Sequence, residues 1–209
     1  MSGIVAQNVG RPSGLIKAAE GGGGTWVEIK TLTSDGSDAT LSFVDGTSDV
    51  VLDSTYPIYC FRFINMSGDT VATKFQFNLS TDGGSNYDVT KTSTLFRSYS
   101  GESIPGQYGV GYITARDLQQ STAFQDLGET IGSDADCSQV GFMYLYDPAN
   151  TTFVKQFIAN LHHESGTYAW NAYVAGFGNT TSAVDAIQFK MSSGDIDSGK
   201  IKLFGIKDS

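Results

Sequence analysis

The chain has 209 residues, a formal net charge of −9, 25 glycines and four prolines, which suits a single globular domain rich in turns. The acidic balance argues against nucleic acid and anionic membranes as partners, because their phosphate groups would be repelled. No run of residues is apolar enough to span a bilayer or to act as a signal peptide, so we expect synthesis in the cytoplasm without export.

The first 24 residues are expected to form an arm. They contain scattered aliphatic side chains without a sustained period and end in four consecutive glycines, a composition typical of a flexible joint. Two interpretations stay open: a disordered leader, or an anchor that orders on a neighbouring subunit. The anchoring residues would be Ile4, Val5, Val9, Arg11, Leu15 and Ile16.

Four segments after the glycines have the pattern of β-strands. Residues 26–33, 39–43 and 72–80 alternate apolar with polar side chains, as half-buried strands do. Residues 56–66 are apolar on both faces, so this strand is expected to be covered twice or to meet another subunit. We expect residues 87–92 to pair with 72–80 in a hairpin, because the intervening Asp-Gly-Gly supplies the positive φ angles of a tight turn.

The middle of the chain is the least regular part. Residues 93–138 are rich in glycine and lack a sustained period, which predicts a long irregular excursion with one strand near 108–115. Strand patterns resume at 139–146, 153–163 and 167–177.

In the C-terminal stretch, residues 185–207, apolar and polar side chains alternate both before and after a Ser/Gly/Asp loop. This pattern predicts a closing hairpin. In all, about nine or ten strands at hairpin spacing favour an all-β fold: an antiparallel two-sheet β-sandwich, jelly-roll-like, forming one domain over residues 25–209. Its expected core residues are Trp26, Phe61, Phe75, Phe77, Phe142, Phe157, Trp170, Ile187, Phe189 and Leu203.

Metal and cofactor sites are not expected. His162 and His163 are adjacent, so on a strand their imidazoles point to opposite faces and cannot share an ion with Glu164. Loops with paired aspartates, such as the one at 195–197, offer only part of a calcium shell. The two cysteines, Cys60 and Cys137, are expected to stay reduced.

Catalysis is not expected either, because the chain has neither a G-x-S-x-G nucleophile elbow nor a phosphate-binding loop. A glycosidase would need two carboxylates in one cleft, and the sequence does not pair Glu28, Asp88, Asp147 or Asp185.

Glycan binding is a more serious alternative. Trp170, Asn171 and Tyr173 together could form a platform that stacks on sugars and hydrogen-bonds to them. The same segment also fits a core strand with Tyr168 and Trp170 facing inward, which is the interpretation we favour.

Several segments resemble a family of small β-sandwich proteins found as virion components of tailed bacteriophages, especially marine ones. The matching segments are SGIVAQNVGRPSGLIK, STYPIYCFRFINM, FQFNLSTDGGSNYD and VDAIQFKMSSGDIDSGKIKLFGIK, whereas residues 93–136 match nothing in the family. The resemblance implies a virion structural protein made in the host cytoplasm, with no catalytic position.

This placement predicts a capsid decoration or cement protein. Its arm and oligomer interfaces would dock on other virion proteins, the major capsid protein above all, and we expect a symmetric homo-oligomer, with a trimer favoured. The alternative is a tail-fibre or receptor-binding module that recognises host surface glycans. A third possibility is a tail-associated enzyme that degrades polysaccharide.

Overall fold

The computed structural model describes residues 25–103, 105–132 and 136–208. The expected arm, residues 1–24 with its six anchoring side chains, lies outside the described residues. Within them the chain is built from strands and one short 3₁₀ helix. These elements are β1 (Trp26–Thr33), β2 (Leu41–Val44), β3 (Ile58–Gly68), β4 (Phe75–Ser80), β5 (Lys91–Gly101), β6 (Tyr108–Tyr112), η1 (Thr114–Arg116), β7 (Gln125–Asp126), β8 (Gln139–Tyr146), β9 (Lys155–Glu164), β10 (Tyr168–Gly178), β11 (Ala186–Met191) and β12 (Ile196–Ile206).

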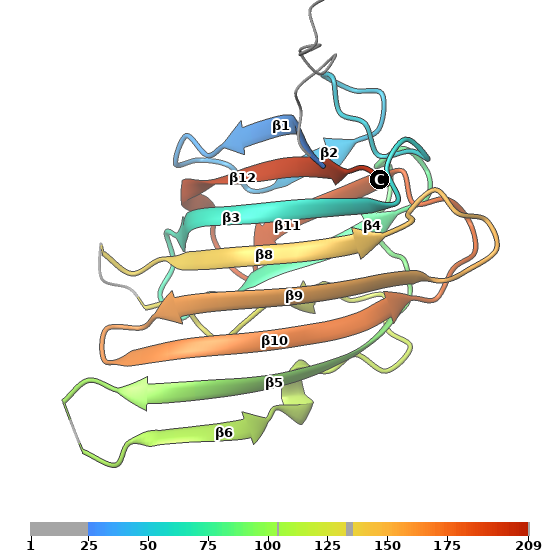
Figure 1. The fold of residues 1–209 in the computed structure, drawn as a ribbon. Helices are drawn as coiled ribbons and strands as arrows, with labels where there is room; N and C mark the ends of the chain where they lie inside the picture. The colour runs from blue at the N-terminus through green and yellow to red at the C-terminus, as the bar shows by residue number, and fades with distance from the viewer. Residues whose placement is uncertain (1–24, 104, 133–135, 209) are drawn as a thin grey trace, which may run out of the picture.

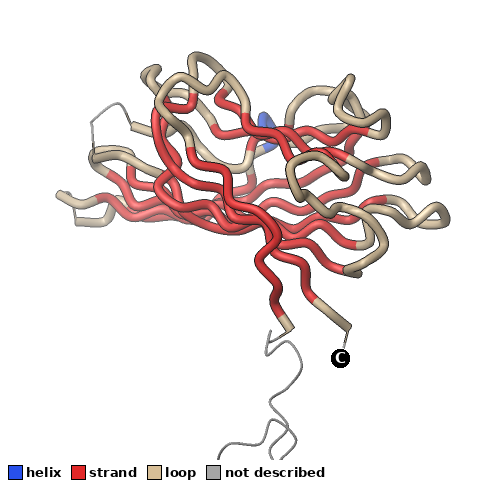
Figure 2. Tube along the Cα trace, turned by 90° about the horizontal axis from the view of Figure 1, so that it is seen from above, coloured by secondary structure: helices blue, strands red, loops and turns tan. Residues whose placement is uncertain are grey.

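The strands form two antiparallel sheets packed face to face, which confirms the predicted all-β sandwich. The larger sheet has eight strands in the order β1-β12-β3-β8-β9-β10-β5-β6, and the smaller has four in the order β2-β11-β4-β7. Figure 1 shows the larger sheet in front of the smaller one, and Figure 2 shows the two layers from above. The first described residues run beside the last, because Lys207 N–H donates to the carbonyl of Thr25 at 2.8 Å.

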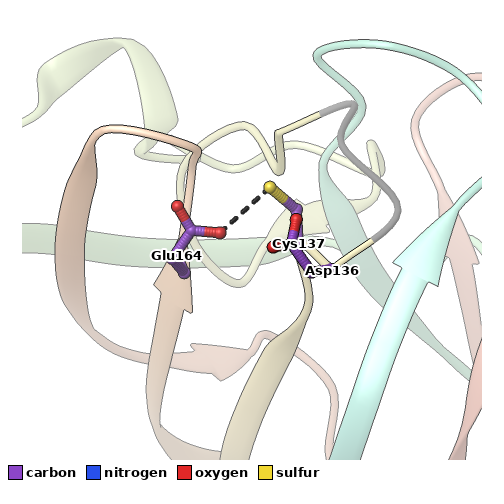
Figure 3. Close-up of side chains that lie close together, drawn as sticks. All are labelled: Asp136, Cys137 and Glu164. Atoms are coloured by element: carbon purple, nitrogen blue, oxygen red, sulfur yellow. Dashed lines mark hydrogen bonds between the residues drawn. The ribbon is translucent and has the colours of Figure 1, made fainter.

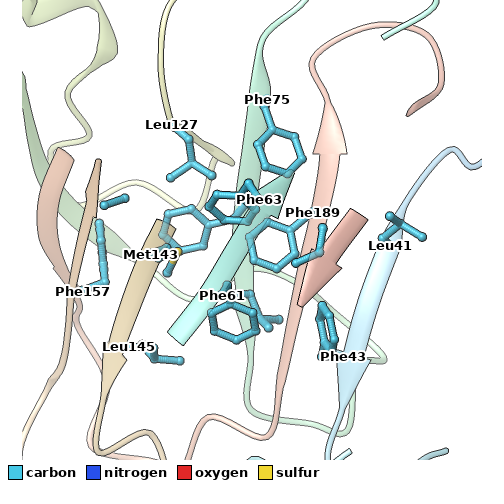
Figure 4. Packing of buried hydrophobic residues seen from close by; sticks show 14 of the residues in the cluster. Leu41, Phe43, Phe61, Phe63, Phe75, Leu127, Met143, Leu145, Phe157 and Phe189 are labelled. Carbon is cyan, nitrogen blue, oxygen red and sulfur yellow. The ribbon is translucent and has the colours of Figure 1, made fainter. Parts of the chain in front are cut away.

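The core between the sheets is dominated by phenylalanines (Figure 4). The ring of Phe189, on β11, lies at the centre, with ring centroids 5.4 Å from Phe61, 5.3 Å from Phe63 and 5.7 Å from Phe75. All four rings are buried. Each such side chain stabilises the fold by about 1.5–3 kcal/mol on burial, so this cluster joins the two layers.

The predicted C-terminal hairpin is wrong, because its two strands lie in different sheets. β11 pairs with β2 and β4, whereas β12 pairs with β1 and β3. The loop between them crosses from one layer to the other through Gly194, which has a φ of 69°. Two strands that face each other across a core bury alternate side chains just as two paired strands do, so the alternation does not distinguish the two arrangements.

The C-terminal strands instead lie inside both sheets. β12 is inserted between β1 and β3, and β11 is inserted between β2 and β4. The consecutive segments β1–β2, β11–β12 and β3–β4 therefore lie side by side as they pass from one sheet to the other. Each sheet depends on the end of the sequence to join its early strands.

The predicted hairpin between residues 72–80 and 87–92 is also wrong. β4 pairs with β11 and β7, and residues 87–90 form no strand. The glycines of the turn do adopt the expected positive φ, 70° at Gly83 and 78° at Gly84. They redirect the chain into β5 of the larger sheet, which the turn residues alone do not reveal.

The irregular excursion expected over residues 93–138 is narrower in the structure. Most of its first part is the regular strand β5, and β6 falls within the predicted 108–115. Apolar and polar residues do not alternate along β5, because its inner side carries polar groups. Ser93 Oγ donates to Gln125, and Arg97 pairs with Glu129. The irregular part lies between β6 and β8.

Two expected core residues, Trp26 and Phe142, lie on the other side of the larger sheet. Trp26 is 42% exposed, and Phe142 occupies the outward positions of β8 together with Val140 and Tyr144. β8 is apolar on both faces, so its inward set could not be chosen from the sequence. Phe61, Phe75, Phe77, Phe157, Ile187, Phe189 and Leu203 are buried as predicted.

Candidate docking surface

The side of the larger sheet that faces away from the smaller sheet is called here the outer face. Figure 1 views it directly, and no described segment covers it. The strand registers align one side chain from every strand in a row that crosses the whole sheet. This cross-strand row is Thr31, Lys202, Arg62, Phe142, Asn160, Tyr173, Phe96 and Tyr112.

One half of the row is an aromatic and amide surface on β9, β10 and β5. The rings of Tyr173 and Phe96 are stacked, with centroids 4.9 Å apart and an interplanar angle of 9°. Asn160 Nδ2 donates to Asn171 Oδ1 at 2.6 Å, and Asn171 Nδ2 donates to the Tyr173 hydroxyl at 3.2 Å. These contacts join neighbouring side chains across the three strands.

The other half of the row borders a shallow groove of about 620 Å³ over β1, β12, β3 and β8. Trp26, Phe142 and Phe204 supply its aromatic walls, and Arg62 and Lys202 supply positive charge. The guanidinium carbon of Arg62 lies 5.9 Å from the centre of the Phe142 ring. Lys202 Nζ lies 3.1 Å from a carboxylate oxygen of Glu28, whose pKa is lowered first by the Thr31 hydroxyl and then by Lys202.

The predicted sugar platform is divided by the sheet. Asn171 and Tyr173 lie on the outer face, but Trp170 is on the inner side, where its indole N–H donates to Ser165 Oγ at 2.8 Å. The inward position of Trp170 agrees with its predicted place on a core strand. Phe96, which sequence analysis did not single out, takes the place beside Tyr173.

On the inner side of β5, a chain of ion pairs links the larger sheet to the segment between β6 and β8. Arg97 Nη1 lies 2.7 Å from Glu129, Arg116 bridges Glu129 at 3.2 Å and Asp126 at 3.3 Å, and Lys74 completes the chain at 3.1 Å from Asp126. Asp126, in β7, and Glu129, in the loop after it, both come from the segment between β6 and β8. That segment therefore supports the half of the larger sheet that carries β5 and β6.

Burial shifts the pKa of several groups on the inner side, Lys91 and His163 among them. Desolvation lowers the pKa of Lys91 to about 7, although the ammonium donates to Val89 O at 2.8 Å and to Asn78 Oδ1. Desolvation also lowers the pKa of His163 to about 4, with His162 adding to the effect. His162 is exposed on the outer side of the same strand, as the alternation predicted.

The described residues contain one cluster with metal-binding atoms: Asp136, Cys137 and Glu164, whose ligand atoms lie within 4.8 Å of one another (Figure 3). The Cys137 thiol donates to Glu164 Oε2 at 3.0 Å, and Glu164 Oε1 accepts a hydrogen bond from the Gly166 N–H. Both oxygens of Glu164 thus have hydrogen-bond donors within the chain. The Cys137–Glu164 hydrogen bond joins the chain just before β8 to the end of β9.

Comparison with known proteins places the chain in no family: no family model, no curated protein and no solved structure matches it. Over the described part of the chain, no helix has the length and apolar character needed to cross a membrane.

Proposed function

We propose that the protein is a structural component of a phage virion, and specifically a capsid decoration or cement protein. The observation that carries the proposal is the outer face, where a row of mainly aromatic, amide and basic side chains crosses all eight strands. Small ligands are held in concave pockets that enclose most of their surface, whereas a face that spans eight strands and has only a shallow groove suits a macromolecular partner.

The composition of the face supports a protein partner. Interfaces between proteins are enriched in Tyr, Trp, Phe and Arg, which are the residues gathered around the groove and the cross-strand row. The face also carries Arg62 and Lys200 although the chain has a net charge of −9, whereas the charge of Lys202 is paired with Glu28. We therefore expect the partner surface to be apolar with carboxylates opposite these cations, the major capsid protein being the first choice.

The proposal also includes the arm, the homo-oligomer and the jelly-roll-like fold that the sequence predicts. Residues 1–24 form an arm that engages neighbouring subunits, and the protein acts as a homo-oligomer within the virion. The fold is jelly-roll-like, which is supported by the way β11–β12 runs beside β3–β4 in both sheets.

The test places a carboxylate in the middle of the outer face. Ile158 is 47% exposed and lies between Tyr144 and Ala175 of the adjacent strands, so Ile158→Glu does not disturb the core. We expect the variant to be incorporated into virions at least about tenfold less than the wild type, because each tenfold loss corresponds to about 1.4 kcal/mol of binding free energy. Quantitative mass spectrometry of purified particles measures the copy number.

The matched control is Val71→Glu, in the loop between β3 and β4, where the valine is 68% exposed. This variant should be incorporated normally. Wild-type incorporation of Ile158→Glu would overturn the assignment of the outer face. A wild-type copy number on the order of hundreds fits the capsid surface, whereas about a dozen would place the protein on the tail. Deletion of residues 1–20 tests the arm by the same measurement.

A second function, glycan recognition by a tail module, is favoured by one specific arrangement. The stacked pair Phe96–Tyr173 lies beside the amide groups of Asn160 and Asn171, and aromatic faces next to amides are suited to sugars. Host adsorption distinguishes the two functions, since particles lacking a cement protein adsorb normally but resist heat and osmotic shock poorly.

A further inference from the structure

β6 is one of the two edge strands of the larger sheet, and its outer edge is unpaired among the described residues. β6 pairs with β5 on one side, and no strand among the described residues pairs with it on the other. Its side chains are strongly exposed: Tyr108 is 74% exposed, Val110 is 78% and Tyr112 is 57%. Exposed apolar edge strands are sites where another strand adds to a sheet.

The hydrogen bonds to β5 show which backbone groups point to the free edge. Gly101 N–H donates to Gln107 O at 2.6 Å, and Ile113 N–H donates to Leu95 O at 3.0 Å. In an antiparallel pair the bonding residues alternate, so the odd-numbered residues of β6 bond to β5. The N–H and C=O groups of Tyr108, Val110 and Tyr112 therefore point away from the sheet.

The sequence of this strand is a palindrome, Tyr108-Gly109-Val110-Gly111-Tyr112. If two copies pair antiparallel about Val110, each Val110 faces the other Val110, and each Tyr108 faces Tyr112 of the second copy. These are the residues with free backbone groups, so each of the three pairs exchanges both hydrogen bonds. The strand thus complements itself in backbone and in side chains.

The two edges of the sheet differ in how they are protected. β1, the opposite edge, has an irregularity between Glu28 and Lys30 and carries both charges, features that discourage pairing. Residues 103–113 contain no charged side chain, so two copies meet here without bringing like charges together despite the net charge of −9.

We infer that two copies of this chain associate through β6, forming a two-fold dimer in which the larger sheets join into one continuous sheet. The tyrosines of both copies then lie on one shared outer face. This inference is independent of the function proposed above, because it concerns the contact between copies and not their partner. It replaces the trimer expected from the sequence with a two-fold contact.

The first test is the mass of the purified full-length protein by light scattering, followed over a dilution series. The chain has a mass of 22.3 kDa, and we expect twice this value, falling to the monomer on dilution. Val110→Lys should be monomeric at concentrations where the wild type is dimeric, because it places two ammonium groups at the two-fold axis. Val71→Lys, a change at a similarly exposed valine in a loop, should stay dimeric. A monomeric or trimeric wild type would overturn the inference.

Charge exchange tests the two-fold geometry. Val110→Glu alone should also be monomeric, but an equimolar mixture of Val110→Lys and Val110→Glu should form a heterodimer, since opposite charges then face each other. The rescue also shows that both variants are folded. If the mixture stays monomeric, position 110 does not lie at the axis and the inference fails.

A crosslink gives the distance directly. Paired residues that exchange hydrogen bonds have Cα atoms about 5.5 Å apart, which is within the range of a disulfide. Val110→Cys should therefore form a disulfide dimer rapidly under copper–phenanthroline oxidation, while Val71→Cys should not. The native thiols give little background because Cys60 and Cys137 are buried. Equal crosslinking of the two variants would contradict the β6 contact.

Discussion

The guanidinium carbon of Arg97 lies 4.2 Å from the centre of the Trp170 ring, on the inner side of the larger sheet. The same side chain forms the ion pair with Glu129, so it ties two adjacent strands to the irregular segment that covers them. Trp170 is therefore part of the support beneath β5 and β6.

Removing the charge of Arg97 should destabilise the fold. Arg97→Met loses the ring contact and one of the two cations that bind Glu129, and we expect the free energy of unfolding to fall by about 1–3 kcal/mol. Urea denaturation measures the change. Arg62→Met on the outer face is the matched control and should cost less than about 1 kcal/mol, since Arg62 makes a ring contact at an open surface. Equal losses in the two variants would contradict the structural role of Arg97.

His163 should make stability depend on pH between about 4 and 6.5. Burial lowers its pKa from 6.5 to about 4, so in this range the unfolded chain binds a proton that the folded protein does not. The free energy of unfolding therefore falls as the pH falls from 6.5 to 4, by at most about 3 kcal/mol from this residue. Urea denaturation at several pH values measures the slope.

The slope should become smaller in His163→Phe, whatever that change costs at neutral pH. His162→Phe, on the outer side of the same strand, is the control and should keep most of the slope, because the burial of His163 is untouched. An unchanged slope in His163→Phe would assign the acid sensitivity to other groups and contradict the role given to His163.

Two glycines of β6 should respond differently to alanine. A Cβ on Gly109 would lie 2.9 Å from the Tyr99 ring, whereas a Cβ on Gly111 would meet nothing closer than 4.0 Å. We expect Gly109→Ala to lower the free energy of unfolding by about 1–3 kcal/mol through overpacking. Gly111→Ala should stay within about 1 kcal/mol of the wild type. Thermal unfolding compares the pair, and similar melting temperatures would show that Tyr99 can move aside.

If the outer face binds glycans, changes at Tyr173 or Phe96 should weaken glycan binding, whereas a change at Trp170 should not. Tyr173→Ala removes the ring stacked on Phe96 and should weaken binding to host surface glycans about tenfold or more. Trp170→Phe should leave glycan binding unchanged and reduce stability, because its ring faces the other way. Glycan-array or calorimetric binding separates these outcomes, and a loss of binding in Trp170→Phe alone would restore the platform expected from the sequence.

Strand positions could be predicted from the sequence where one face is apolar and the other polar. β10 is close to its predicted range, and β8 matches 139–146 even though both its faces are apolar. Pairing could not be predicted in the same way, as β11 and β12 show: the alternation of Ile187 and Phe189 with Gln188 reports burial and carries no information about which strand lies alongside. β5 cannot be predicted from alternation because its inward residues include Ser93 and Arg97, which are partly buried and are held by hydrogen bonds and an ion pair.

The candidate surface was only partly accessible from the sequence. The sequence points to Asn171 and Tyr173, but Phe96 lies in a segment without a sustained period, and the pattern of residues 139–146 predicts Phe142 in the core. The outward apolar residues of β8 were a usable signal, since a strand with two apolar faces must be covered on both or meet a partner. The row across the sheet could not be foreseen, because it depends on the register of seven strand pairs.

The interleaved order of the strands has a consequence for how the molecule forms. Among the described residues, β1 pairs only with β12 and β2 only with β11, so both early strands are left without these neighbours until the far end of the sequence has been synthesised. Such distant pairing is slow and leaves apolar strands exposed in the meantime. A nascent chain that stops before Ala186 therefore has two open half-sheets, and is expected to require a chaperone or to aggregate.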